Sequence, residues 1–213
     1  MALDALRWEN KLKARVSFWR EKFRGRMMER RWLPSDPSIT VSQFIAGQCA
    51  NSLTAAFGGR MLAALTAVKE QSFPDEKGPS SVVRFVHNEE MRRASERMVN
   101  HWRLTGLIGF DFMLDAAGQA WLIECNPRPT QIAHLGARVG EDLCLALHRG
   151  LAGGRELLRP AAPMELTVAH FPKETWRDPN SPYFASAFHD VPWDDPDLLD
   201  CLKKARPPRP RER

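Results

Sequence analysis

The sequence between residues 107 and 128 alternates apolar and polar positions on both sides of a short turn. Before the turn, Phe110, Phe112 and Leu114 alternate with Asp111 and Met113; after it, Trp121, Ile123 and Cys125 alternate with Leu122, Glu124 and Asn126. A period of two that reverses at a glycine is typical of a β-hairpin. If the turn centres on Ala117 and Gly118, paired positions sum to 235, which places Asp111 opposite Glu124.

Two carboxylates in directly opposed positions need a compensating group. Their Cβ atoms would lie about 4.5–5.5 Å apart, where like charges destabilise a strand pair. A shared proton or a divalent cation would remove the repulsion. Asn126 adds an oxygen on the same face, and hard cations such as Mg²⁺ take oxygen ligands together with substrate phosphates. The alternative is that both residues are solvated on an open sheet face, with the register misjudged by one.

The residues around this pair resemble a known family. The segments are Gly109-Phe110-Asp111-Phe112 and Ile123-Glu124-Cys125-Asn126-Pro127-Arg128, followed by Gln131 and His134. They are similar to the metal- and phosphate-binding hairpin of the ATP-grasp superfamily, and most similar to its carbamoyl-phosphate synthetase large-chain and biotin carboxylase branch. The resemblance implies that Asp111, Glu124 and Asn126 bind Mg²⁺ or Mn²⁺ bridging ATP phosphates. It also implies that Arg128 contacts phosphate or substrate, a role that suits a guanidinium.

Two further segments acquire expected roles from the resemblance. Residues 41–47 look like the strand that leads into the adenine pocket, so Gln43, Phe44 and Ile45 are candidate cofactor-binding residues. Gln43 stands where the family carries a Glu, and a Gln can hydrogen-bond an adenine edge without charge. Arg84, on an expected strand at 82–86, is the candidate for a basic residue approaching the terminal phosphate; the alternative for it is a solvated edge charge.

Hydrophobic patterning predicts the remaining elements. We expect a hairpin of strands 51–57 and 60–68 about Gly58-Gly59, a loop at 70–81, and a helix from an Asn88 cap to about 105. A helix is expected from about 141 to 153, a strand at 164–171, and a last helix capped by Asp195 with Pro196 at its first position. The last part of the chain should be an extended appendage that packs its aromatic side chains on the body; these are Trp176, Tyr183, Phe184 and Trp193.

Histidines add candidates of another kind. His134, His148 and the pair His189-Asp190 could act as ligands, as acid–base groups or in a substrate site. His134 and His148 also fit ordinary surface or core positions. For His189 and Asp190, the favoured alternative is a packed, hydrogen-bonded pair.

Charge is concentrated at the two ends of the chain. The net charge is +5, and residues 1–33 hold ten Lys or Arg against four Asp or Glu. Apolar residues at helical spacing there predict a basic amphipathic helix ended by Pro34 and Pro37. We therefore divide the chain into a basic helix and linker (1–37), a partial ATP-grasp domain (38–154) and a C-terminal appendage with a basic tail (155–213). The expected fold class is α+β, with a mostly antiparallel sheet and flanking helices.

Composition limits the function classes. With 43% hydrophobic and 27% charged residues, the chain is typical of a globular protein. The four cysteines form no C-x-x-C pair and indicate a reducing compartment, so we expect a cytoplasmic protein. No apolar run is long enough for a membrane span, and without a stacking motif or zinc-finger spacing we do not expect nucleic-acid binding.

The Gly-rich phosphate lid of the first ATP-grasp subdomain is not evident in this sequence. The resemblance therefore covers the second half of the fold, and we expect weak Mg²⁺·ATP binding by the chain alone. With the missing half supplied by another polypeptide, or if the chain is a fragment of a longer gene product, it would act as an ATP-dependent ligase on an unknown carboxylate and amine, through an acyl phosphate. The alternative is a non-catalytic remnant that serves as an interaction module through its basic helix and tail; a glycosidase-type acid pair is more distant.

Overall fold

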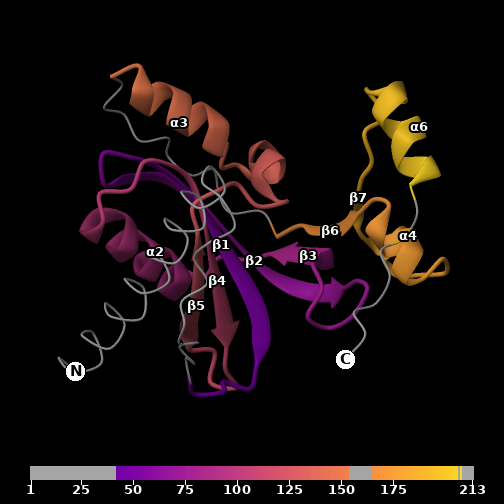
Figure 1. Cartoon of the computed structure of the whole chain (residues 1–213), viewed down its shortest axis with the longest axis horizontal. Coiled ribbons are helices and arrows are strands. Elements are labelled where there is room, and N and C mark those ends of the chain that lie inside the picture. Colours follow the sequence, from indigo (N-terminus) through magenta and orange to yellow (C-terminus); the bar gives the residue numbers. More distant parts are fainter. Residues whose placement is uncertain (1–41, 154–164, 206, 208–213) are drawn as a thin grey trace, which may run out of the picture. The chain divides into compact units, whose positions relative to one another are not determined.

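The computed structural model describes residues 42–153, 165–205 and 207. Its elements belong to one unit, Phe44–Arg213, built on a seven-stranded sheet with the order β5-β4-β1-β2-β3-β6-β7 (Figure 1). All neighbouring strands are antiparallel except the pair β6–β7. The strands are β1 (Gln48–Phe57), β2 (Arg60–Ser72), β3 (Ser80–Phe85), β4 (Gly106–Leu114), β5 (Ala120–Asn126), β6 (Thr167–His170) and β7 (Phe188–Asp190). The expected mixed α+β class is confirmed.

The centre of the sheet is the hairpin β1–β2, which turns where the sequence predicts. Gly58 and Gly59 have φ angles of 60° and 86°, a region that glycine enters without steric cost. Two glycines of this kind form the short turn whose twist matches that of paired strands. The residues of β1 and β2 that flank this turn are mostly buried, since helices cover both faces of the sheet there.

Helix α2 (Glu89–His101) covers one face. Asn88 caps it, with its Oδ1 accepting a hydrogen bond from the Met91 amide at 2.9 Å, as the sequence predicts. Met91 and Val99 then pack with Phe110 and Phe112 of β4. Fully burying each of these side chains contributes about 1.5–3 kcal/mol. The alternating apolar residues of β4 thus face α2, and side chains of β1 and β2 complete this part of the core.

The opposite face is covered by the 3₁₀ helix η1 (Ala133–Val139) and by α3 (Leu143–Leu151). Leu135 and Leu143 pack there against Leu53 and Leu65 of the central hairpin. Helix α3 agrees with the predicted helix, whereas η1 was not predicted. Its seven residues carry a helical pattern too short to recognise, and it ends at Gly140, whose φ is 84°.

The C-terminal segment joins the sheet instead of lying on it as an extended appendage. β6 pairs with β3, and β7 runs beside β6. Short helices α4 (Lys173–Arg177) and α5 (Tyr183–Ser186) connect them, and α6 (Pro196–Lys204) follows with Asp195 as its predicted cap. Trp176 packs near Phe73 with ring centroids 6.1 Å apart, but Trp193 is 72% exposed, so its predicted packing is wrong.

Other expectations have different outcomes. Residues 42–47 form no strand, and β1 begins only at Gln48, because the apparent alternation there is interrupted at Gly47. The predicted basic helix at residues 3–32 lies outside the described residues. Among the helices that the structure describes, none is long and apolar enough to cross a membrane.

Candidate functional site

The hairpin β4–β5 places Asp111 directly opposite Glu124, as the sequence predicts. The turn itself is one residue longer than expected, since Asp115 and Gln119 close it through a hydrogen bond of 3.1 Å between the Asp115 amide and the Gln119 carbonyl. A β-bulge at Ile123 offsets this difference. Bulges of this type re-aim side chains next to functional sites. The predicted pairing is therefore correct, although its assumed turn centre is not.

Asp115 builds the turn that sets this register. Its Oδ1 accepts hydrogen bonds from the amides of Ala117 and Gln119, at 2.9 and 3.0 Å, and its Oδ2 accepts one from Trp121 Nε1 at 2.8 Å. The hydrogen bond from Trp121 is the largest reason why the pKa of Asp115 lies below its usual value. The carboxylate thus fixes both the loop and the first residues of β5.

Asp111 is held between two amide side chains. Asn51, its partner on β1, donates from Nδ2 to Oδ1 at 2.8 Å, and Asn126 donates from Nδ2 to Oδ2 at 2.8 Å. Each carboxylate oxygen has a further lone pair, so both can still accept a cation. With its amide nitrogen directed to Asp111, Asn126 has its own Oδ1 left as a ligand. Asn51 was not singled out by sequence reasoning, because a lone polar residue on a buried strand carries no motif.

Glu124 lacks such partners. It is half-buried on the same face as Asp111, and the described part of the chain provides no hydrogen bond or ion pair to its carboxylate. The negative charge of this pair acts on Cys125, which points to the opposite face and packs near α2. Burial raises the pKa of the Cys125 thiol to about 11, with further contributions from Glu124 and Asp111. Within the described residues, neither Asp111 nor Glu124 forms an ion pair with a basic side chain.

The chain after β5 crosses back over the same face. A Cβ at Gly109 would lie 2.6 Å from Thr130 Cγ2, so the absence of a side chain on β4 is what allows this approach. Thr130 Oγ1 donates to Asn51 Oδ1 at 3.4 Å, and Gln131 Nε2 donates to the Ser80 carbonyl at 3.1 Å. A glycine inside a strand was the sequence signal for this contact.

The other predicted site residues are distributed differently. Arg128 is exposed at the start of the crossing segment, and its Nη1 donates to the neighbouring Pro129 carbonyl at 3.4 Å. Arg84 pairs with Val68, whose side chain belongs to the α2 face, and its Nε lies 2.7 Å from Glu70 Oε1. The structure thus brings Asp111, Glu124 and Asn126 together and places Arg84 on the other face of the sheet.

The residues expected near adenine are exposed. Phe44 is 85% exposed, Gln43 is also exposed, and Ile45 is half-buried. The exposed ring of Phe44 can stack on a planar ligand. The expected role of Gln43, Phe44 and Ile45 in binding adenine stays a prediction.

A second polar cluster joins η1 to the C-terminal strands. Asp190 Oδ1 lies 2.9 Å from His134 Nε2, and Oδ2 lies 3.2 Å from His170 Nδ1. Burial raises the pKa of Asp190, but the hydrogen bonds with His170 and His134 outweigh it, so this pKa lies below its usual value. The predicted hydrogen bond between His189 and Asp190 is not observed, because neighbours along a strand point to opposite sides. His189 instead packs its ring edge-on against Phe184.

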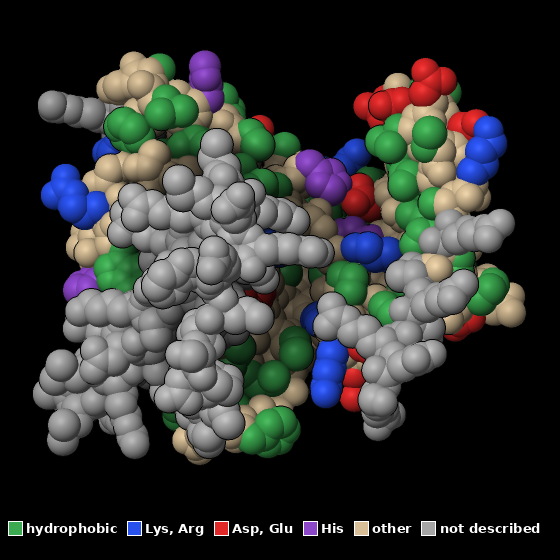
Figure 2. All heavy atoms as spheres, in the orientation of Figure 1, with side chains coloured by type: hydrophobic (Ala, Val, Ile, Leu, Met, Phe, Trp, Pro, Cys, Tyr) green, Lys and Arg blue, Asp and Glu red, His purple; other side chains and the backbone are tan. Residues whose placement is uncertain are grey.

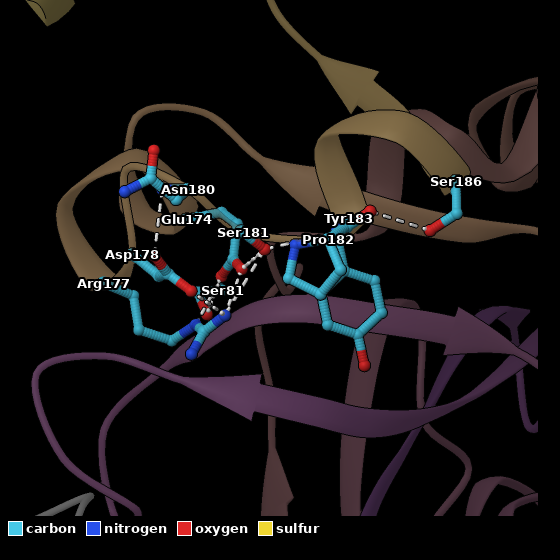
Figure 3. Close-up of polar contacts among 9 residues, drawn as sticks. All are labelled: Ser81, Glu174, Arg177, Asp178, Asn180, Ser181, Pro182, Tyr183 and Ser186. Atoms are coloured by element: carbon cyan, nitrogen blue, oxygen red, sulfur yellow. Dashed lines mark hydrogen bonds and ion pairs between the residues drawn. The ribbon is translucent and has the colours of Figure 1, made fainter.

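A third cluster is centred on Glu174 of α4, which is 1% exposed (Figure 3). Ser81 and Ser181 donate to its carboxylate at 2.8 and 2.5 Å, and Arg177 donates from Nε and Nη2 at 2.8 and 2.5 Å. All of its strong acceptor sites are thus used within the protein. Nothing in the sequence pattern separates this buried glutamate from a surface one, so it was missed.

The donor set of the hairpin fits a hard cation. Its oxygens come from Asp111, Glu124 and Asn126, the kind of ligands that Mg²⁺ combines with water and phosphate oxygens. Among the described residues there is no group of three or more His, Cys, Asp or Glu able to hold a metal by itself. A cation here would therefore need oxygens from a bound ligand to complete its coordination.

Comparisons with known proteins give a partial match. No protein family model matches this sequence, and no curated protein matches it either. Among solved structures, the phosphoribosylaminoimidazole carboxylase ATPase subunit from Aquifex aeolicus is 13% identical with a TM-score of 0.46, over 56% of this chain and 38% of that one.

Two other solved structures give similar values. Biotin carboxylase from Campylobacter jejuni is 13% identical with a TM-score of 0.43, over 59% of this chain and 30% of that one. L-amino acid ligase from Bacillus licheniformis is 19% identical with a TM-score of 0.39, over 59% of this chain and 35% of that one. The chain thus spans about a third of the length of these structures. Each of these is a partial similarity of fold, and the resemblance to the ATP-grasp superfamily stays an expectation from the hairpin sequence.

Proposed function

We propose that the chain binds Mg²⁺·ATP or Mn²⁺·ATP through its β4–β5 hairpin, as the metal-binding part of an ATP-dependent ligase of ATP-grasp type. The observation that carries this proposal is the pair Asp111–Glu124. Two half-buried carboxylates face each other across a strand pair, and the second has no partner in the described chain. Such a pair is costly by itself and becomes favourable with a cation between its members.

Each residue has a role in this proposal. Asp111, Glu124 and Asn126 Oδ1 supply oxygen ligands, and Asn51 orients Asp111 through its amide. Arg128 contributes a planar set of donors for a phosphate. Phe44 and Ile45 would receive the adenine. The proposal leaves out Arg84, whose guanidinium is paired with Glu70 on the other face.

The chemistry that these residues support is phosphoryl transfer. A bound cation would neutralise charge on the phosphates, while the protein positions the groups that react. In an ATP-dependent ligase, a carboxylate takes the terminal phosphoryl group of ATP and ADP leaves. An amine then attacks the resulting acyl phosphate and displaces phosphate. A segment that supplies further phosphate donors would be needed for full activity, so weak binding by this chain alone is expected.

Calorimetric titration with ATP, with and without Mg²⁺, tests the proposal. Binding should require the metal and should be lost in Glu124→Gln, which keeps the shape of the side chain but removes its charge. Glu96→Gln is the matched control, since Glu96 is an exposed residue of α2. Metal-independent binding that both variants retain, and that falls steeply with salt, would instead favour the interaction module.

A further inference from the structure

A recess lies between η1 and the segment formed by β6, α4 and β7. Figure 2 shows His, Lys or Arg, and Asp or Glu side chains gathered on the floor of this hollow, between the α3 side and the α6 side of the unit. Six residues define what we call the basic recess: Gln131, His134, Arg138, His170, Lys173 and Asp190. The proposed metal site uses none of them.

Two basic side chains of the recess have no carboxylate partner. Lys173 is half-buried and donates to Gln131 Oε1, a neutral acceptor. Arg138 lies with its Cζ 4.2 Å from the centroid of the Phe188 ring. Neither forms an ion pair within the described residues, in contrast to Arg177, which pairs with Glu174. An ammonium withdrawn from water without a directly paired carboxylate is unfavourable, and a bound anion would compensate it.

The one acidic group of the recess is already engaged. Asp190 has His134 on one carboxylate oxygen and His170 on the other. The charges of Lys173 and Arg138 therefore exceed that of Asp190, which leaves the recess with a net positive charge. Burial lowers the pKa of Lys173, while the charge of Asp190 partly opposes this change.

His170 gives an independent sign of an incomplete site. It is 4% exposed, and its Nε2 atom is buried without a hydrogen-bond partner among the described residues. Buried polar atoms nearly always have a partner, and an exception needs a specific cause. A ligand or a ligand-ordered water would supply it.

We propose that the basic recess binds the carboxylate group of a small molecule, held by Lys173 and Arg138 beside His134. The choice of a carboxylate over another anion rests on the proposed ligase function, in which a carboxylate is the group to be activated. The segment that lines the recess continues directly from the proposed metal site: Thr130 contacts Asn51, and the next residue, Gln131, contacts Lys173. The recess would thus hold one substrate near the bound nucleotide.

Binding can be measured on the full chain without ATP or metal. Acetate, succinate and inorganic phosphate are titrated at constant ionic strength, and the imidazole NMR signals of His134 and His170 are followed. A carboxylate should give saturable shifts. Its affinity should fall about tenfold or more in Lys173→Gln and in Arg138→Gln, because each removes a charge-assisted contact.

Matched variants separate this site from general charge effects. Lys203→Gln removes the same charge from an exposed position on α6 and should leave the affinity unchanged. Shifts that never saturate, or that are equal in Lys173→Gln and the unaltered protein, would overturn the proposal. Tighter binding of phosphate than of either carboxylate would overturn its ligand class.

The outcome is distinguishable from that of the proposed function. Saturable carboxylate binding in a protein that does not bind Mg²⁺·ATP would support the recess and contradict the nucleotide site. Mg²⁺·ATP binding without carboxylate binding would support the nucleotide site and contradict the recess. Arg138 is exposed, so its variant tests the recess without disturbing the core.

Discussion

Two carboxylate centres of this unit differ in how their charge is compensated. Glu174 is buried and receives hydrogen bonds from two serines and an arginine. Asp111 receives only two neutral amides, and the opposing Glu124 has no partner in the described residues. The first centre is complete within the protein, which is expected of a structural contact. The second is incomplete, which is expected of a site that binds a cation.

Replacing Glu174 should have the largest effect on stability. Glu174→Gln would leave Arg177 without its counter-ion and disrupt contacts that hold α4 to Ser81 of β3. We expect a loss of about 3 kcal/mol in the free energy of unfolding, measured by urea denaturation. A loss below about 1 kcal/mol would show that Glu174 does not anchor the C-terminal segment.

The same contact should make stability depend on pH. Burial raises the pKa of Glu174, but the hydrogen bonds from Arg177, Ser181 and Ser81 outweigh it and hold this pKa below its usual value. The stabilisation is thus present above the usual carboxyl pKa and is lost as pH falls through the lowered one. The difference in unfolding free energy between the unaltered protein and Glu174→Gln should shrink in this acidic range.

Gly109 offers a test of how the crossing segment is placed. Gly109→Ala puts a Cβ 2.6 Å from Thr130 Cγ2, so the segment must shift, at a cost of about 1–3 kcal/mol. Metal-dependent ATP binding should weaken as well, because Arg128 lies at the start of this segment. Adding Thr130→Ser removes the clashing methyl group and should restore most of the stability; no restoration would contradict this contact.

Replacing Glu124 should change the stability of the protein in the opposite direction to replacing Glu174. Glu124→Gln removes a like-charge repulsion, so the metal-free protein should become more stable by about 0.2–1 kcal/mol. Added Mg²⁺ and ATP should stabilise the unaltered protein and not the variant, as thermal unfolding can measure. A marked loss of stability in the metal-free variant would mean that Glu124 has a structural partner after all.

The reactivity of Cys125 should respond to the charge of the pair Asp111–Glu124, and this is the smallest effect that we expect. Its raised pKa of about 11 predicts that alkylation by iodoacetamide is slow near neutral pH compared with the exposed Cys144 and Cys201. The midpoint of its rate against pH should move downward in Glu124→Gln, because one negative charge is gone. A midpoint that does not move would place the charge of Glu124 away from this strand.

Local patterns predicted much of this unit. The turn at Gly58-Gly59, the Asn88 cap and the alternation in β4 are read from neighbouring residues, and all three are observed. The alternation expected in β5 is interrupted by the bulge at Ile123, so Leu122 and Cys125 both pack on the α2 face. The pair Asp111–Glu124 was also found, because a hairpin brings close what lies near in sequence.

Long-range contacts could not be predicted in this way. The contacts of Asn51 with Asp111 and of Ser81 with Glu174 join residues 60 and 93 positions apart. The tertiary fold decides these contacts, and a single residue carries no signal of them. The pairing of β6 with β3 was missed for the same reason, so the C-terminal segment was interpreted as an appendage.

Paramagnetic broadening by Mn²⁺ tests the cation site most directly. In the presence of ATP, substoichiometric Mn²⁺ should broaden the backbone NMR signals around Asp111, Glu124 and Asn126 first, and Glu124→Gln should abolish this effect. Signals near Glu174 should stay sharp at the same metal concentration. Broadening that is absent from the hairpin, or unchanged in Glu124→Gln, would contradict the account.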